Sequence, residues 1–167
     1  MFRPGFDLDE ERERRAAAGQ PEWFGEDDLY DDVRPALAAL RTAGLWLGIA
    51  GTQTVRAGGL LRGLLESDVD LIGTSDDWGA SKPDPVFFER LTKAVPVFSA
   101  ETLYVGDRLD NDIRPAAKAG LRTALIRRGP WGTIQQHHPD AAQLPTMRID
   151  SLVELRDGIA KCNGTAR

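Results

Sequence analysis

Short apolar runs alternate with segments of helical periodicity along most of this chain. Four runs have the length of strands, and the first of them is nearly all apolar, as expected of a strand that is buried on both faces. They are residues 45–50, 69–75, 102–107 and 122–128. The first three are each followed by an expected helix, at 54–67, from Asp84 onward and at 111–120. Strands that alternate with helices over short connections predict an α/β fold with a doubly wound parallel sheet.

The two ends of the chain depart from this alternation. Residues 7–19 are highly charged and predict a solvated helix that ends at Gly19, before a loop. A helix that starts at Val33 then leads into the first strand. Residues 129–148 have the composition of a long loop, and residues 147–160 predict a short strand and a last helix. We therefore divide the chain into an N-terminal helical segment, 1–29, and an α/β core, 30–167.

Composition narrows the possible functions. The 167 residues suit one domain, and a net charge of -5 argues against a nucleic-acid surface, which needs clustered basic residues. The single cysteine, Cys162, excludes an internal disulfide. No run approaches the roughly 18 apolar residues of a membrane span, and the N-terminus lacks the pattern of a signal peptide. We expect a cytoplasmic protein with no membrane partner.

Polar side chains follow the predicted strands, where parallel α/β sheets bind their ligands. Thr52 follows the first strand, Lys82 lies beyond the second, and Asp107 and Asp112 follow the third. Carboxylates are typical Mg²⁺ ligands, and lysine offers a point charge to phosphate. Each residue also has an ordinary alternative: aspartates cap helices, a lysine is commonly a surface residue, and threonine is common in turns.

Three stretches together resemble the haloacid dehalogenase-like (HAD) superfamily. VGDRLDND (105–112) resembles its fourth motif, SKPDP (81–85) its third, and LWLGIAGTQT (45–54) stands where its second belongs. The resemblance implies a HAD-like Rossmannoid core, with the N-terminal segment as the end of a helical cap. It also implies an Mg²⁺-dependent phosphomonoester hydrolase that acts on a small phosphorylated metabolite through an aspartyl-phosphate.

The resemblance also implies a role for each matching residue. Asp107 would bind Mg²⁺ directly, and Asp112 would support the metal through its water shell. Lys82 would neutralise the nucleophile and the phosphoryl oxygens. In the second motif, Gly51 occupies the usual Ser/Thr position, so Thr52 would assist from one residue later. A catalytically inactive binding or regulatory domain of the same fold is the alternative, and a dehalogenase is disfavoured by the acidic cluster.

The first motif of this superfamily, Asp-x-Asp at the end of a buried strand, poses a difficulty. Asp7 and Asp9 have the right spacing, but MFRPG precedes them where an apolar strand should run, and a charged helix follows. We interpret this stretch as a helix start, with the true nucleophile outside the sequence, rather than as a degenerate motif. In the family the first strand lies between those of motifs two and four. Without it, we expect 45–50 and 102–107 to face each other unpaired.

The remaining polar and aromatic residues at this edge have simpler interpretations. Asp76 and Asp77 are expected to be solvated loop charges, and Trp78 and Trp131 to serve packing rather than a pocket. The pair His137 and His138 is expected at the surface. None of these matches a motif of the resemblance.

Overall fold

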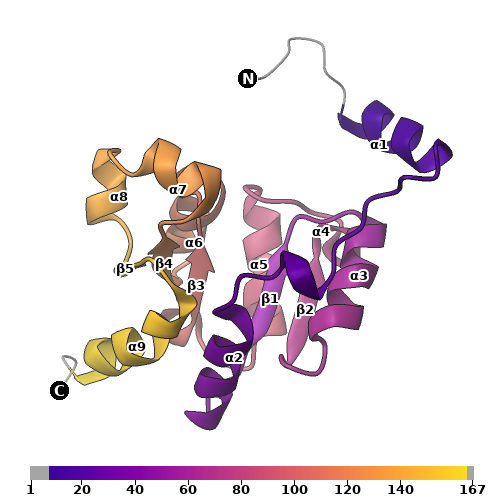
Figure 1. Ribbon diagram of the computed structural model, residues 1–167. Coiled ribbons are helices and arrows are strands. Elements are labelled where there is room, and N and C mark those ends of the chain that lie inside the picture. Colours follow the sequence, from indigo (N-terminus) through magenta and orange to yellow (C-terminus); the bar gives the residue numbers. More distant parts are fainter. Residues whose placement is uncertain (1–7, 165–167) are drawn as a thin grey trace.

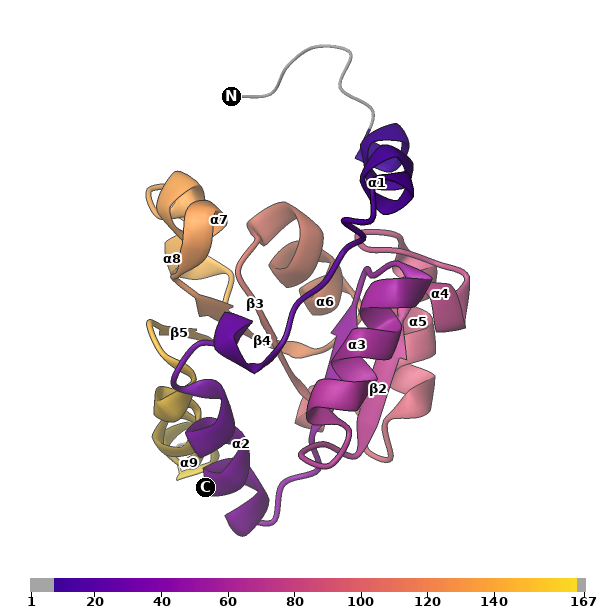
Figure 2. The same cartoon turned by 45° about the vertical axis from the view of Figure 1, so that its right-hand side comes forward.

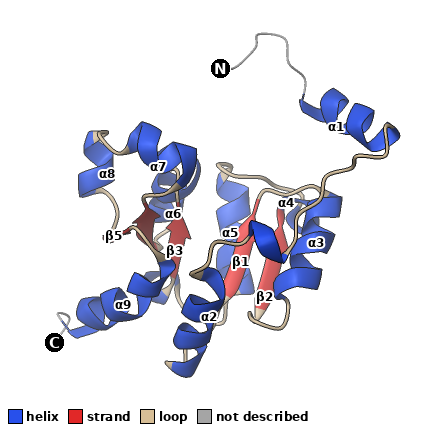
Figure 3. Ribbon diagram, in the orientation of Figure 1, coloured by secondary structure: helices blue, strands red, loops and turns tan. Residues whose placement is uncertain are grey.

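The computed structural model describes residues 8–164, and its strands form two parallel sheets. The first sheet pairs β1 (Gly48–Gly51) with β2 (Leu71–Thr74). The second has the order β3 (Leu103–Gly106), β4 (Arg122–Ile126), β5 (Met147–Ile149). Figure 3 shows the two groups of strands side by side with helices around them. The expected α/β class and the parallel strand arrangement are confirmed.

Helices account for most of the remaining described residues. They are α1 (Leu8–Ala17), α2 (Val33–Thr42), α3 (Val55–Leu65), α4 (Ser75–Trp78), α5 (Pro85–Ala94), α6 (Arg114–Lys118), α7 (Gly129–Gln135), α8 (Pro139–Gln143) and α9 (Leu155–Gly164). Short 3₁₀ turns lie at η1 (Glu26–Asp28), η2 (Ser99–Glu101) and η4 (Leu152–Glu154), and a π turn at η3 (Leu109–Ile113).

Local chemistry explains where several helices begin and end. The Thr54 hydroxyl accepts from the Ala57 amide and caps α3, and the Asp84 carboxylate accepts from the Val86 amide at the start of α5. Gly44 and Gly120 adopt positive φ of 78° and 81° just after α2 and α6, a conformation in which glycine has no steric penalty. These starts and stops agree with the sequence pattern.

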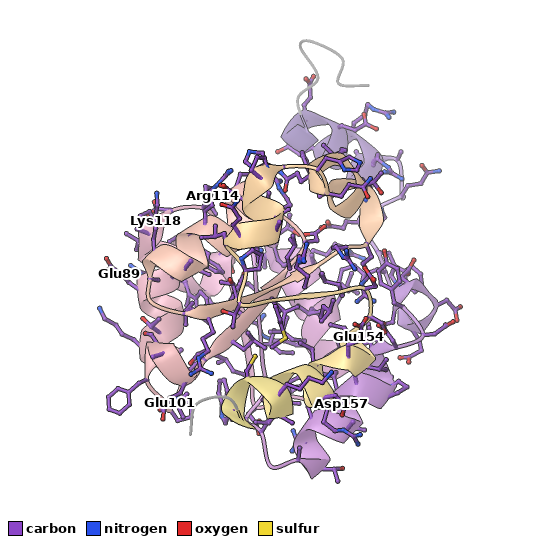
Figure 4. All side chains as sticks on the ribbon, turned by 90° about the vertical axis from the view of Figure 1, so that its left-hand side faces the viewer. Glu89, Glu101, Arg114, Lys118, Glu154 and Asp157 are labelled. Atoms are coloured by element: carbon purple, nitrogen blue, oxygen red, sulfur yellow. The ribbon has the colours of Figure 1, made fainter. Side chains whose placement is uncertain are left out.

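The core consists of apolar clusters on the two faces of the strands. Phe87 and Phe88 of α5 pack with Tyr104 and with the segment around α6. On the other face, Leu40 of α2 and Leu155 of α9 pack against β4 and β5. Figure 1 shows α3 and α5 on either side of β1 and β2. Figure 4 shows charged side chains such as Glu89, Lys118 and Asp157 on the outer surfaces of their helices.

Strands β1 and β3 are not paired with each other in the described part of the chain. The side chain of Tyr104 bridges them instead, with its hydroxyl 3.5 Å from the Ala50 carbonyl oxygen. Most of β1 is only half-buried and Gly48 is exposed, whereas β4 is buried from Thr123 to Ile126. The expectation of two strands that face each other unpaired is confirmed.

Three expectations need correction. Residues 129–148 contain the helices α7 and α8, because Pro130 and Pro139 sit in first turns where proline is tolerated. The first strand begins at Gly48 rather than at Leu45, since pairing with β2 starts there. Asp76 and Asp77 lie in the helical turn α4, where Asp77 accepts from the Thr74 amide and hydroxyl.

The segment before α2 is joined to the far end of the chain by Asp32. Its carboxylate accepts from the Arg128 guanidinium at 2.7 Å, the Ser151 hydroxyl at 2.6 Å and the Leu152 amide at 2.7 Å. Desolvation raises the pKa of Asp32, but these bonds outweigh it and hold the pKa below its usual range. This residue ties α2 to the loops after β4 and β5.

Helix α1 stands apart from both sheets (Figures 1 and 2). Its backbone includes Asp9, in agreement with the interpretation of this stretch as a helix, while Asp7 lies outside the described residues. The division at residue 29 stays a prediction. Among the described residues, no helix is long and apolar enough to cross a membrane.

Candidate active site

The loop before α5 brings Lys82 to the carboxyl ends of the strands. The Asp84 cap and Pro85 fix the start of α5, so the preceding residues turn back over the sheet edge. The Lys82 amide donates to the Thr52 hydroxyl at 3.0 Å, which joins this loop to the end of β1. The Lys82 ammonium lies 2.6 Å from Asp112 Oδ1. Three of the four residues singled out from the sequence are therefore connected.

Asp112 is nearly inaccessible, with 4% of its side chain exposed against 15% for Lys82. Its second oxygen accepts from the Arg108 amide at 3.2 Å, so both oxygens have a donor. Gly106 makes this position possible, since a Cβ there would lie 2.4 Å from the Cβ of Asp112. A buried carboxylate group is normally paired and hydrogen-bonded in this way.

Asp107 follows β3 directly and is the fourth predicted residue. Burial raises the pKa of its carboxyl group, and the charge of Asp112 raises it further. Lys82 and Arg108 oppose these effects only in part, because the net shift is upward. Burial of the carboxyl group is therefore the main cause of the shift, and the neighbouring charge of Asp112 adds to it.

The donor set is suited to a hard divalent cation. No group of three or more His, Cys, Asp or Glu side chains able to hold a metal occurs within residues 8–164. Two carboxylates are nevertheless compatible with Mg²⁺, which keeps several waters and commonly uses one or two carboxylates. Asp107 and Asp112 would supply those carboxylates, so the residues present fit Mg²⁺ and would not form a closed zinc site.

Tyr104 is the buried aromatic residue next to Lys82, Asp107 and Asp112. It is 8% exposed, and its ring lies 6.0 Å from the Lys82 ammonium, within the range of a weak cation–π contact. Burial raises the pKa of Tyr104, and the charges of Asp112 and Asp107 add to the effect. The hydroxyl therefore stays protonated and can donate to the Ala50 carbonyl.

Helix α7 contributes residues that the sequence did not single out for chemistry. The guanidinium of Arg108 stacks on the Trp131 indole at 4.1 Å and pairs with Asp110 at 2.6 Å. The hydrogen bond from Arg108 lowers the pKa of Asp110 to about 2. Gln135 bonds the same loop. The Trp131–Arg108 stack agrees with the packing expected for Trp131.

Tyr30 also approaches this edge. A Cβ built on Gly129 would lie 3.9 Å from the Tyr30 hydroxyl and 4.0 Å from Asp107 Oδ2, so the two groups flank the same glycine. The Arg128 guanidinium lies 4.0 Å from the Tyr30 ring centroid. The expected surface position of His138 agrees with its exposure, although it caps α8 by accepting from the Asp140 amide.

Comparison with known proteins gives consistent matches. Residues 79–155 match the model of the HAD-hydrolase-like family. A glyceraldehyde 3-phosphate phosphatase of Methanopyrus kandleri is 35% identical over 130 residues, which are 77% of this chain and 55% of that protein. The chain therefore spans little more than half the length of this curated relative.

Solved structures agree. A HAD phosphatase from Thermococcus onnurineus matches with a TM-score of 0.66 and 27% identity, over 93% of this chain and 65% of that one. The HAD-hydrolase YfnB from Bacillus subtilis, bound to magnesium, matches with a TM-score of 0.64 and 28% identity, over 77% of this chain and 55% of that one. The fold, the arrangement of the site residues and the relatives all agree with a single superfamily.

Proposed function

The chain belongs to the haloacid dehalogenase-like superfamily, and we propose that its carboxyl edge serves Mg²⁺-dependent hydrolysis of a small phosphomonoester. The observation that carries the proposal is the junction of Lys82, Thr52 and Asp112 beside Asp107. A cation, a hydroxyl and two carboxylates that lie close together support binding of a phosphoryl group beside a metal ion. A glyceraldehyde 3-phosphate phosphatase among the relatives supports the substrate class.

Each residue has a role in this proposal. Asp107 would hold Mg²⁺ and Asp112 would support it through its water shell; the ion supplies charge neutralisation at the phosphoryl oxygens when bound. Lys82 would bind a phosphoryl oxygen while Asp112 keeps its ammonium in place. The Thr52 hydroxyl, already an acceptor from the Lys82 amide, would donate a hydrogen bond to a phosphoryl oxygen. The buried ring of Tyr104 would keep water away from the Lys82 ammonium on the side where the two are in contact.

The nucleophile would be an aspartate on a strand between β1 and β3. The resemblance places the first motif there, and these two strands have no ladder with each other in the part of the chain that the structure describes. The carboxylate would attack phosphorus and form an acyl-phosphate bond while the ester P–O bond breaks. A second aspartate would give the leaving oxygen its proton, and water would then release phosphate and restore the carboxylate.

Turnover of p-nitrophenyl phosphate, with and without Mg²⁺, tests the activity in a protein that carries this chain together with the strand of the first motif. We expect hydrolysis that requires Mg²⁺ and that falls at least about 100-fold in Asp107→Asn, because a metal-stabilised charge is lost. Asp76→Asn, at an exposed position of α4, is the matched control. Hydrolysis that is unchanged by EDTA and by Asp107→Asn would refute the proposal.

Within residues 8–164, the edges of β1 and β3 that face each other are unpaired, and this favours one second candidate, a binding domain without turnover. In that case the chain would show no hydrolysis under any metal condition while still binding Mg²⁺. Metal titration in parallel with the turnover assay separates the two candidates.

A further inference from the structure

The segment between Asp107 and Asp112 is an unusual piece of backbone. The amides of Asp112 and Ile113 both donate to the Arg108 carbonyl at 3.0 Å, which gives a single π turn at Leu109–Ile113. Isolated π turns are rare and occur frequently at functional sites. Since one such turn contributes few bonds of its own, the spacing of the two aspartates depends on what holds the turn from outside.

Gln135 holds the turn from helix α7. Its side-chain oxygen accepts from the Leu109 amide at 2.7 Å, and its side-chain nitrogen donates to Asp110 Oδ1 at 3.0 Å. The Leu109 amide can only donate and the Asp110 carboxylate can only accept, so the primary amide has one orientation that satisfies both. These bonds link residues 25 and 26 positions apart, so they fix tertiary rather than local structure.

Trp131 lies on the same face of α7, one turn earlier than Gln135. Its indole supports the Arg108 guanidinium at 4.1 Å, and Arg108 in turn bonds Asp110 at 2.6 and 3.3 Å. Gly132 lets α7 pack against the backbone just after β4, because a Cβ there would lie 2.7 Å from the Arg127 carbonyl carbon. Helix α7 therefore contributes two side chains, Trp131 and Gln135, that contact residues 108–110 at the start of the turn.

We propose that Gln135 is a positioning residue that sets the geometry of the metal-binding turn. This inference rests on the proposed function. Lys82 holds Asp112 from inside the site, and Gln135 holds Leu109 and Asp110 from outside, so the turn is fixed on both sides. Gln135 touches neither predicted metal ligand, and its effect reaches Asp107 and Asp112 through the backbone between them.

The test compares Gln135→Leu with Gln136→Leu in the full chain. Gln136 is the exposed neighbour and loses the same polar group. Isothermal titration with Mg²⁺ should show about 10-fold weaker binding in Gln135→Leu and no change in the control, the size of effect typical when a group that orients metal ligands is removed. Hydrogen exchange, measured by mass spectrometry without metal, should be faster over residues 107–113 in Gln135→Leu alone.

A compensating pair separates positioning from general destabilisation. Asp110→Asn combined with Gln135→Glu restores an acceptor for the Leu109 amide and reverses the donor and acceptor of the second bond. Its Mg²⁺ affinity should return to within about 3-fold of the wild type, well inside the 10-fold loss. Exchange and affinity in Gln135→Leu that both equal those of Gln136→Leu would overturn the inference.

Faster exchange with unchanged Mg²⁺ affinity would also overturn it, since the clamp would then be structural only. Failure of the proposed function has a different signature. The wild type would then not bind Mg²⁺, or would bind it equally well after Asp107→Asn, and the metal role of Gln135 would fall with it. In that case the exchange data would still show whether the clamp exists.

Discussion

Replacement of Lys82 by methionine removes the cation that faces a nearly inaccessible carboxylate. In the wild type, Asp112 receives one bond from Lys82 at 2.6 Å and one from the Arg108 amide at 3.2 Å. After Lys82→Met only the amide remains. Loss of one partner from a buried ion pair costs about 3–5 kcal/mol, and we expect the lower end, about 3 kcal/mol, because that amide stays bonded.

Urea denaturation measures this loss directly, and thermal unfolding should show it as a fall of about 6–12 °C in Tm. Asp112→Asn in the same chain removes the unpaired charge, so the double variant should recover at least about 1 kcal/mol relative to the sum of the two single changes. Mg²⁺ should stabilise Lys82→Met more than the wild type, because the cation meets the carboxylates that lysine no longer offsets.

A loss below about 1 kcal/mol in Lys82→Met, with no coupling to Asp112→Asn, would refute the reasoning. It would mean that water reaches Asp112 readily, despite the 4% exposure of its side chain.

Three further predictions concern stability. Asp32→Asn should reduce the loss of folding stability in acid. The lowered pKa of Asp32 in the folded state stabilises the fold fully above about pH 4, and this stabilisation is lost as the pH falls through the folded-state pKa. Urea denaturation curves that depend on pH in the same way in both proteins would contradict this. Gly73→Ala should cost about 1–3 kcal/mol in urea denaturation, since a Cβ there would lie 2.1 Å from a Trp78 ring atom, whereas Gly59→Ala meets nothing within 4 Å and should stabilise α3. Because β1 and β3 are not paired with each other within the described residues, we expect the isolated chain to be poorly stable or to self-associate. A monomer that unfolds cooperatively above about 50 °C, within the usual Tm range of single domains, would argue against this prediction.

The part of the site that lies in local motifs was predictable from the sequence. Asp84 followed by Pro85 marks a helix start, and Gly-Asp after an apolar run marks a strand end, so Lys82 and Asp107 could be placed at one edge. The α/β class was predictable too, because the alternation of strands and helices is visible in local sequence patterns. Their assignment as site residues stays a prediction, now supported by the contacts of Lys82 with Thr52 and Asp112.

Other features depend on tertiary structure. Helix α7 begins Gly-Pro-Trp-Gly, which resembles a turn, and Ile134 is 67% exposed, so no apolar face signals the helix. Strand β1 begins at Gly48, because pairing with Leu71 rather than hydrophobicity determines its start. The bonds of Gln135 to residues 25 and 26 positions away have no local signature at all.

Binding of inorganic phosphate to the full chain tests the central claim most directly, since it needs no nucleophile. Titration of phosphate with and without Mg²⁺, into the wild type, Asp107→Asn and Lys82→Met, separates the roles of metal and lysine. The account predicts binding that requires Mg²⁺ and weakens at least about 10-fold in either variant. Phosphate binding that is equal in all three proteins and independent of Mg²⁺ would contradict it.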